Sequence, residues 1–173
     1  MTLLAFGCEA RVGKDTAVDY LIGKKGGVRK SFAAPLYDIQ HYTHTRLGLN
    51  SRKDREFLQL VGDWGRKKNE HIFINVLLRE IDTNKVSDSL TEGRDVYVSD
   101  VRYPNEFMCL KNRGFTMVRL TRDNRFVSAD TNVTSHSSEN SLQGYPWDVI
   151  ISNNGNLNDL YAQLDQLYLN SKK

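Results

Sequence analysis

The chain has 173 residues, 39% of them hydrophobic and 26% charged, and a formal net charge of +3. That length suits one domain with a sizeable core, and no apolar run approaches the length of a membrane span. The mild positive charge suits small anionic ligands and is too weak to predict stable nucleic-acid binding. The two cysteines, Cys8 and Cys109, fit a reducing compartment better than a disulfide scaffold, and the first residues lack a secretory signal. We therefore expect a cytoplasmic protein.

The first predicted elements are a short buried strand over residues 3–6 and a helix over residues 14–24, joined by a glycine-bearing loop. Backbone N–H groups at the start of a helix point into one space and carry the positive end of the helix dipole. Lys14 adds a point charge suited to the β- and γ-phosphates of a nucleotide. The pattern makes a nucleoside triphosphate the first ligand to consider. The candidate binding residues are Arg11, Val12, Gly13, Lys14, Asp15 and Thr16.

The spacing of this loop departs from the usual phosphate-loop pattern, in which four residues separate two glycines and Lys-Ser/Thr follows. Five residues separate Gly7 from Gly13, Cys8 occupies the usual position of the first glycine, and Asp15 follows Lys14. An alternative interpretation is that Gly-Lys-Asp-Thr is only a turn and a helix cap. Its position at the first strand-to-helix turn favours the phosphate loop.

The remaining elements alternate between strands and helices. Strands are predicted over residues 28–32, 96–99, 116–120 and 149–152, and helices over 36–47, from 51 to near 66, over 70–83, over 105–113, and behind Asn156. A polar linker is expected over 84–95 and a polar functional segment over 122–143. This alternation predicts an α/β fold with a parallel sheet. Ligands of such sheets bind beyond the carboxyl ends of the strands, which places residues 7–16, 33–38, 100–102 and 122–125 on one rim.

An acidic residue and an arginine follow the predicted strand over residues 96–99. Asp100 at a strand end can hold Mg²⁺, directly or through water. Arg102 can bind a phosphate through two parallel N–H groups, which a lysine cannot do. The alternative is a surface ion pair between Asp100 and Arg102, but their position on the predicted rim favours a functional role.

Four further candidates each have a structural and a functional interpretation. Glu106, near the start of a predicted helix, can cap that helix or hold an arginine. Arg66, at a predicted helix end, can reach a second anionic ligand or stack on Trp64. Arg122 and Arg125 begin the polar segment, where they either neutralise charge during phosphoryl transfer or are solvated loop charges.

Two polar runs in the last third of the chain complete the candidates. The run from His136 to Glu139 is not a hydrolase site, because the chain has no Gly-x-Ser-x-Gly elbow and neighbours in sequence do not make a catalytic triad. His136 and Glu139 are interpreted as structural or lid contacts. Asn153 follows the last predicted strand in a turn, and Asn156 is the expected cap of the final helix.

Together these residues resemble the deoxynucleoside monophosphate kinases of phages and large viruses, within the phosphate-loop kinases. The resemblance rests on blocks that occur in order along nearly the whole chain, at residues 11–16, 31–36, 58–62 with Arg66, 99–106, 114–122, 136–139 and 150–157. The pair formed by Gly-Lys-Asp-Thr and Asp-Val-Arg-x-Pro-Asn-Glu is the most specific feature.

The resemblance implies a single phosphate-loop kinase domain over residues 1–173 with a five-stranded parallel sheet, a monophosphate-binding helical insertion over about 35–85 and a lid over about 122–143. It implies an enzyme that uses ATP and Mg²⁺ to convert deoxynucleoside monophosphates to diphosphates. The catalytic residues would be Lys14, Asp100, Arg102, Arg122 and Arg125. The ATP site would comprise residues 11–16 with Asn153 on the adenine side, and Thr16 and Asp100 would hold the metal. The acceptor site would comprise Ala33, Asp38, Trp64, Arg66, Arg102 and Glu106.

The resemblance also sets expectations about partners, and this chain departs from the family pattern at two positions. Small nucleotides are the expected ligands, no membrane is expected, and similar kinases are often homodimers; a viral chain would work in the host cytoplasm. Cys8 stands at the usual first-glycine position, and Tyr37 stands where related sequences often have a lysine that serves the acceptor. The residues do not reveal which base and sugar are accepted.

Two rival classes remain open at this point. The scaffold would also suit a kinase for another small molecule, of the dephospho-coenzyme A or phosphomevalonate type, or a nucleotide-dependent switch without an acceptor. The arginine beside Asp100 and the lid-like segment favour a kinase, because a switch needs no second phosphate site. A kinase acting on nucleic-acid ends would need a more basic surface and a base for its hydroxyl acceptor.

Overall fold

The structure is a computed structural model that describes residues 1–7, 11–86, 94–123 and 141–172, with the backbone alone described at residues 83–86. Two units divide the chain. The sheet unit comprises Met1–Lys30 and Thr91–Lys173, and the helical unit comprises Ser31–Leu90. In the described ranges, no helix has both the length and the apolar character needed to cross a membrane.

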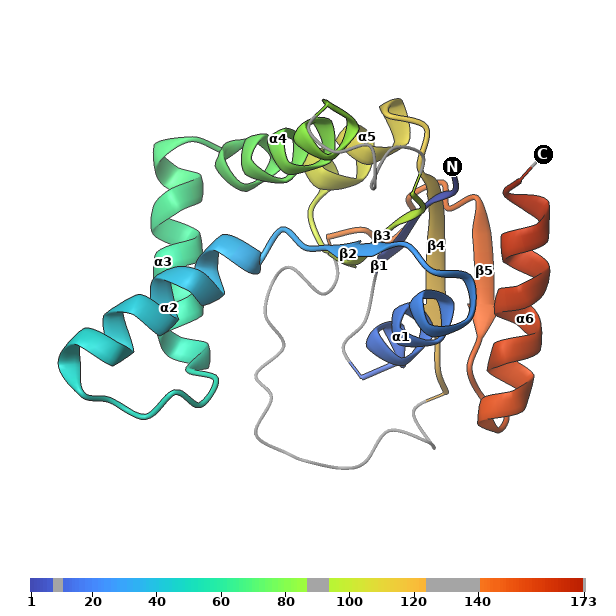
Figure 1. The fold of residues 1–173 in the computed structure, drawn as a ribbon, viewed down its shortest axis with the longest axis horizontal. Helices are drawn as coiled ribbons and strands as arrows, with labels where there is room; N and C mark the ends of the chain where they lie inside the picture. Colours follow the sequence, from blue (N-terminus) through green and yellow to red (C-terminus); the bar gives the residue numbers. More distant parts are fainter. Residues whose placement is uncertain (8–10, 87–93, 124–140, 173) are drawn as a thin grey trace. The chain divides into compact units, whose positions relative to one another are not determined.

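The sheet unit contains five strands that all pair in parallel, in the order β2-β3-β1-β4-β5 (Figure 1). Their bounds are β1 Leu3–Gly7, β2 Val28–Lys30, β3 Val96–Val101, β4 Thr116–Thr121 and β5 Val149–Ser152. Strand β1 lies between β3 and β4, and its residues Leu4, Ala5 and Phe6 are fully buried. A continuous apolar run is what a strand covered on both faces requires. The predicted α/β fold with a five-stranded parallel sheet is therefore confirmed.

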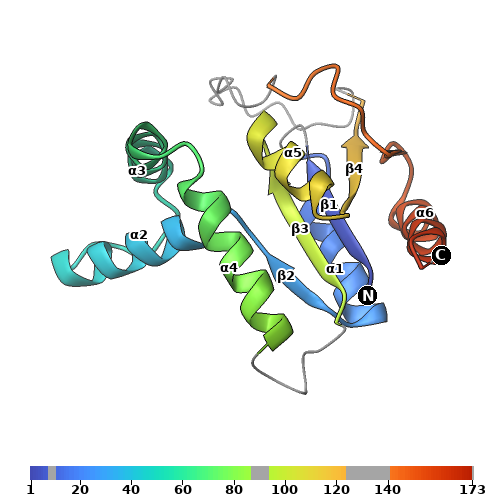
Figure 2. The same cartoon turned by 90° about the horizontal axis from the view of Figure 1, so that it is seen from above.

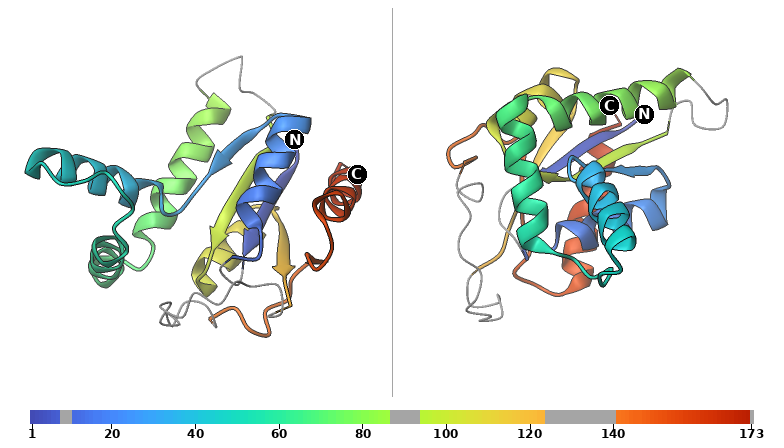
Figure 3. Two further views of the ribbon diagram at one scale, coloured as in Figure 1. Left: turned by 90° about the horizontal axis from the view of Figure 1, so that it is seen from below. Right: turned by 90° about the vertical axis from the view of Figure 1, so that its left-hand side faces the viewer.

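Helices cover both faces of this sheet. Helix α1 (Lys14–Lys25) and helix α6 (Leu157–Asn170) contact each other, and both pack on the sheet face that includes Leu4 and Phe6. Helix α5 (Pro104–Asn112) contacts β4 and lies on the opposite face (Figures 1 and 2). The view from below shows α1 in front of the strands (Figure 3). The loops that leave β1 and β3 therefore turn to opposite faces of the sheet.

Helix α6 forms as its sequence predicts. The Asn156 side chain accepts hydrogen bonds from the N–H groups of Asn158 and Asp159, and the Asp159 carboxylate accepts the N–H of Asn156 in return. This reciprocal cap satisfies N–H groups that the helix itself leaves unpaired. The buried side of the helix includes Leu160 and Leu164, so the apolar stripe is part of the core, as predicted.

A polar cluster joins β3 to α6 at the amino ends of the strands. The Asp95 carboxylate accepts hydrogen bonds from the Tyr168 hydroxyl at 2.6 Å, the Tyr97 hydroxyl at 3.4 Å and the Thr2 N–H. Burial alone would raise the pKa of Asp95, but the hydrogen bonds from Tyr168 and Thr2 outweigh it and hold the pKa below its ordinary value. Burial and the nearby Asp95 charge raise the pKa of Tyr97. The ionised Asp95 is therefore the form that the folded state favours.

The helical unit contains α2 (Ala34–Leu47), α3 (Arg55–Lys68) and α4 (Ile72–Val86), and α3 contacts both of the others. The buried Gln40 side chain donates to the carbonyl oxygen of Arg52 at 2.8 Å and accepts the N–H of Asp54 at 3.2 Å. The loop before α3 is thereby attached to α2. The cap of α3 is Asp54, whose carboxylate accepts the N–H of Phe57, and the predicted cap at Ser51 is wrong.

The predicted end of α3 near Arg66 is also wrong, because the helix continues to Lys68. Gly62 and Gly65 suggested a stop, but a Cβ at Gly65 would lie 3.0 Å from the ring of Phe73. Glycine serves close packing between α3 and α4 at this point, and it does not end the helix.

Several other boundaries differ from the prediction by a few residues, among them those of β2, β3 and α4. Strand β2 ends at Lys30, because the Ser31 hydroxyl accepts the N–H of Ala33 in a turn that leads into α2. Strand β3 extends beyond residue 99 to Val101, which pairs with Gly7 of β1. Asp100 therefore lies inside the strand rather than after it. Helix α4 continues to Val86, so the predicted polar linker over residues 84–95 begins later.

Candidate functional site

The described part of the turn from β1 into α1, residues 11–13, ends at a glycine that begins the helix. Gly13 is the N-cap of α1 and has the left-handed conformation, with φ 98° and ψ 20°, and its carbonyl oxygen accepts the N–H of Ala17 at 3.0 Å. Lys14 is therefore the first residue of the helix, where backbone N–H groups have no partner within the helix itself. Phosphate groups bind at such helix starts.

Gly7, one residue before the usual first-glycine position, has a packing reason to be glycine. A Cβ at this position would lie 2.5 Å from the Trp147 ring and 2.9 Å from the carbonyl oxygen of Val101. The end of β1 thus admits no side chain, which the spacing of the loop did not reveal. Cys8 lies outside the described residues.

The first turn of α1 is held by an arginine that sequence reasoning missed. The Arg29 guanidinium, from β2, donates to the carbonyl oxygen of Asp15 at 3.2 Å and to the Asp19 carboxylate at 2.8 Å. The Asp15 side chain itself is exposed, and Thr16 is partly buried. Arg29 lies 14 residues beyond Asp15 in the sequence, so the local sequence pattern around the loop gives no indication of this contact. Arg11 is exposed and has φ 62°, an uncommon value for a residue other than glycine.

The carboxyl end of β3 brings Asp100 and Arg102 to the edge of the sheet where the loop begins. Val101 pairs with Gly7, so the ends of β1 and β3 are level. Asp100 is partly buried and Arg102 is exposed. This shared edge is the one that the strand–helix alternation predicts.

Glu106 holds the backbone that carries Arg102. Its side chain is 3% exposed, and Oε2 accepts the N–H of Arg102 at 2.9 Å and the N–H of Tyr103 at 3.1 Å. The sequence allowed Glu106 either to cap helix α5 or to hold an arginine. The structure shows Glu106 as a cap of this helix. The Ser141 hydroxyl donates to the carbonyl oxygen of Arg102 and ties the opposite side of the same turn.

The ends of β4 and β5 supply the remaining described candidates of the sheet unit. Arg122 follows β4 and is partly buried, and its Nε is buried without a hydrogen-bond partner among the described atoms. Asn153 follows β5 and is buried, and its side-chain amide donates to the carbonyl oxygen of Val12 at 2.8 Å. Arg125, His136 and Glu139 lie outside the described residues.

Four candidates for the acceptor site belong to the helical unit. Ala33 is the N-cap of α2, and Asp38 is exposed on the same helix. The Arg66 guanidinium lies over the ring of Phe73, 5.1 Å from its centroid, whereas Trp64 is 59% exposed. Phe73, which the sequence did not suggest, is therefore an aromatic partner of Arg66.

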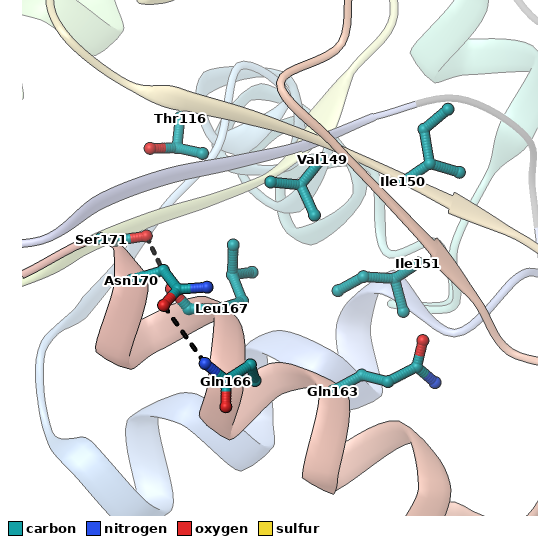
Figure 4. Close-up of a pocket in the computed structure, with 9 residues that line it drawn as sticks. All are labelled: Thr116, Val149, Ile150, Ile151, Gln163, Gln166, Leu167, Asn170 and Ser171. Atoms are coloured by element: carbon teal, nitrogen blue, oxygen red, sulfur yellow. Dashed lines mark hydrogen bonds between the residues drawn. The ribbon is translucent and has the colours of Figure 1, made fainter.

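A cavity of about 400 Å³ lies elsewhere, between β5 and the second half of α6 (Figure 4). It includes the first residues of β4 and β5, so it lies toward the amino ends of these strands, away from the edge that carries the loop. No residue that lines it is a candidate from the sequence. The lining residues are Thr116, Val149, Ile150, Ile151, Gln163, Gln166, Leu167, Asn170 and Ser171.

The described residues contain no group of three or more His, Cys, Asp or Glu side chains that could hold a metal ion alone. Magnesium at a nucleotide site is usually held by one or two protein oxygens, with phosphate and water completing its shell. Asp100 at the end of β3 is chemically suited to such a partial site.

The fold and this edge are consistent with one class of protein. An all-parallel five-stranded sheet flanked by helices, with a glycine-led helix directly after the central strand β1, is consistent with a phosphate-loop kinase-like fold. The resemblance stated above implies the same fold.

Comparison with known proteins finds two viral relatives, while no family model matches the chain. The chain is 30% identical over 147 residues to "Uncharacterized protein ORF77" of Ictalurid herpesvirus 1, an alignment that covers 83% of this chain and 60% of the herpesvirus protein. It is 25% identical over 181 residues to "Putative deoxynucleotide monophosphate kinase" of Acanthamoeba polyphaga mimivirus, which covers 88% of each chain. The chain thus spans about 60% of the length of the herpesvirus relative.

Proposed function

We propose that this protein is a kinase that transfers the γ-phosphoryl group of ATP to deoxynucleoside monophosphates and so forms diphosphates for DNA synthesis. The observation that carries the proposal is the turn at Gly13, where the central strand of a parallel sheet passes into a helix that begins with a lysine. The mimivirus relative, named for this activity, supports the same substrate class.

The donor half of the reaction follows from the loop. Lys14 and the N–H groups at the start of α1 would bind the β- and γ-phosphates and stabilise the charge that moves onto the leaving ADP. Magnesium would be held by Asp100 and Thr16, and when bound it supplies further neutralisation of phosphate charge. Positioning and charge neutralisation are the main contributions of a protein to this chemistry.

The acceptor half needs cations and no general base, because a monophosphate already presents an oxyanion. Arg102 would bind the acceptor phosphate, and Glu106 would keep the backbone of Arg102 in place through its two hydrogen bonds. In the helical unit, Arg66 would contribute a second cation, together with Ala33, Asp38 and Trp64. Arg122 and Arg125 would neutralise charge from the segment that follows β4.

The experiment that tests the proposal is an ADP-release assay with purified protein, ATP, Mg²⁺ and each common NMP and dNMP in turn. We expect release that depends on a dNMP acceptor. We expect Lys14→Ala to lower kcat/KM by at least about 100-fold, since it removes a charge that stabilises the transition state. Lys68→Ala, at the exposed end of α3, is the matched control and keeps wild-type activity.

Three results contradict the proposal. Release of ADP without any acceptor indicates a nucleotide-dependent switch or NTPase. Release with dephospho-coenzyme A or phosphomevalonate and with no nucleotide acceptor indicates another small-molecule kinase. Near-normal turnover by a folded Lys14→Ala protein would show that the loop does not belong to the active site.

The acceptor role of Arg102 has its own test. Arg102→Ala raises KM for the monophosphate or lowers kcat, and it changes the affinity for ATP less. Arg113→Ala, exposed at the other end of α5, is the matched control. Equal kinetic constants in wild type and Arg102→Ala would exclude Arg102 from the acceptor site.

A further inference from the structure

The side chain of Asn153 is buried against the phosphate-binding loop. Only 8% of Asn153 is exposed, and its Nδ2 donates to the carbonyl oxygen of Val12 at 2.8 Å. Its backbone N–H donates to the carbonyl oxygen of Thr121 at 2.8 Å. Asn153 therefore links the end of β4 to a loop residue 141 positions away in the sequence.

The contact between Asn153 and Val12 leaves no room for a side chain at Gly13. A Cβ at Gly13 would lie 2.6 Å from Asn153 Nδ2, closer than two such atoms can approach. The φ of 98° at Gly13 is a second, independent reason for glycine. The amide of Asn153 thus occupies the space that any side chain at Gly13 would need.

The hydrogen bond to Val12 also determines where an adjacent N–H group points. The Val12 carbonyl and the Gly13 N–H belong to one planar trans peptide unit, so they point in opposite directions. An amide that holds the carbonyl in place consequently directs the Gly13 N–H away from Asn153. Val12 is 1% exposed, so water does not substitute easily for the missing donor if Asn153 is removed.

We propose that Asn153 is a positioning residue that orients the Gly13 N–H group toward the polyphosphate of the bound nucleotide. The proposal rests on the donor half of the proposed function, and it differs from the adenine contact that the family resemblance implies for Asn153. A residue that positions the loop affects every triphosphate equally, whereas an adenine contact affects ATP alone.

The test measures binding of ATP, GTP and inorganic tripolyphosphate by calorimetry, without an acceptor. The variants are Asn153→Ala and Asn153→Leu, of which the leucine keeps the buried volume and removes the donor. Asn158→Ala, exposed on α6, is the matched control. We expect both Asn153 variants to bind all three ligands about tenfold more weakly, which corresponds to the loss of one buried hydrogen bond.

A second readout separates positioning from a general loss of structure. In wild type, tripolyphosphate shifts the amide proton resonance of Gly13, and in Asn153→Leu this shift is smaller while resonances in α6 are unchanged. Rescue by Asn153→Gln, which keeps a donor, supports the proposal further.

The possible failures are distinguishable. Weaker binding of ATP alone overturns the proposal in favour of an adenine contact, and unchanged binding of all three ligands overturns it outright. A wild-type protein that binds no triphosphate overturns both this proposal and the proposed function. Intact triphosphate binding with the expected variant effect, but no phosphorylation of any acceptor, supports the positioning role and contradicts only the kinase activity.

Discussion

Replacement of Gly13 by alanine should lower the free energy of unfolding for two reasons, backbone strain and the loss of a buried hydrogen bond. The left-handed backbone at φ 98° is unfavourable for alanine by about 1–2 kcal/mol. The new Cβ would also lie 2.6 Å from Asn153 Nδ2 and displace that amide from the Val12 carbonyl. Loss of a hydrogen bond to a buried carbonyl costs about 1–3 kcal/mol. Gly13→Ala should therefore lower the free energy of unfolding by about 2–5 kcal/mol.

A double-mutant cycle with Asn153→Ala isolates the second cost. In the Asn153→Ala background the side-chain amide is already absent. Gly13→Ala then costs only the backbone strain, because there is no hydrogen bond left for its Cβ to displace. The two substitutions should couple by about 1–3 kcal/mol, well above the roughly 0.5 kcal/mol within which independent sites add.

The matched control is Gly26→Ala at the other end of α1. Gly26 has a positive φ of 77°, yet no atom lies within 4 Å of the position its Cβ would take. With ψ at −165°, Gly26 lies in a region that almost only glycine adopts, so its replacement should cost backbone strain alone, about 1–3 kcal/mol, and this cost should be the same with and without Asn153.

The assay is urea denaturation followed by tryptophan fluorescence. The chain has two tryptophans, Trp64 in the helical unit and Trp147 in the sheet unit, so a Trp64→Phe background reports on the sheet unit. A cost of Gly13→Ala that is equal in both Asn153 backgrounds would refute the reasoning, as would a Gly13→Ala protein as stable as wild type.

Two further predictions concern stability. Glu106→Ala leaves the N–H groups of Arg102 and Tyr103 without their buried acceptor and should cost about 2–4 kcal/mol in urea denaturation, with Glu106→Gln costing less; a loss below about 0.5 kcal/mol would contradict the cap. Tyr168→Phe removes a hydrogen-bond donor to Asp95. The pKa of Asp95 is lower in the folded state than its ordinary value, so ionised Asp95 stabilises the fold above the ordinary carboxyl pKa. This stabilisation is lost as the pH falls through the folded-state pKa. The variant should therefore lose about 1 kcal/mol at pH 7 and less near pH 3, and an equal loss at both would contradict the assignment.

Local sequence patterns predicted most of the architecture. The apolar run of β1 and the stripe of α6 specify which segments are buried, because burial is the main force that selects strand and helix periodicity. The same patterns placed Asp100 and Gly13 at one edge of the sheet, since parallel strands carry their loops to a common side. Glycines in α3 misled the prediction, because the pattern does not distinguish a glycine that ends a helix from one that admits Phe73.

The sequence by itself determined that a lysine and a glycine meet at the first strand-to-helix turn, and the proposed class of ligand rests on this. Only the tertiary structure decided what holds that turn in shape: Asn153 on Val12, Arg29 on Asp15, and Trp147 against Gly7. The physical reason is that these partners are distant along the chain. Their hydrogen bonds and contacts depend on strand order and register, which short-range periodicity does not contain.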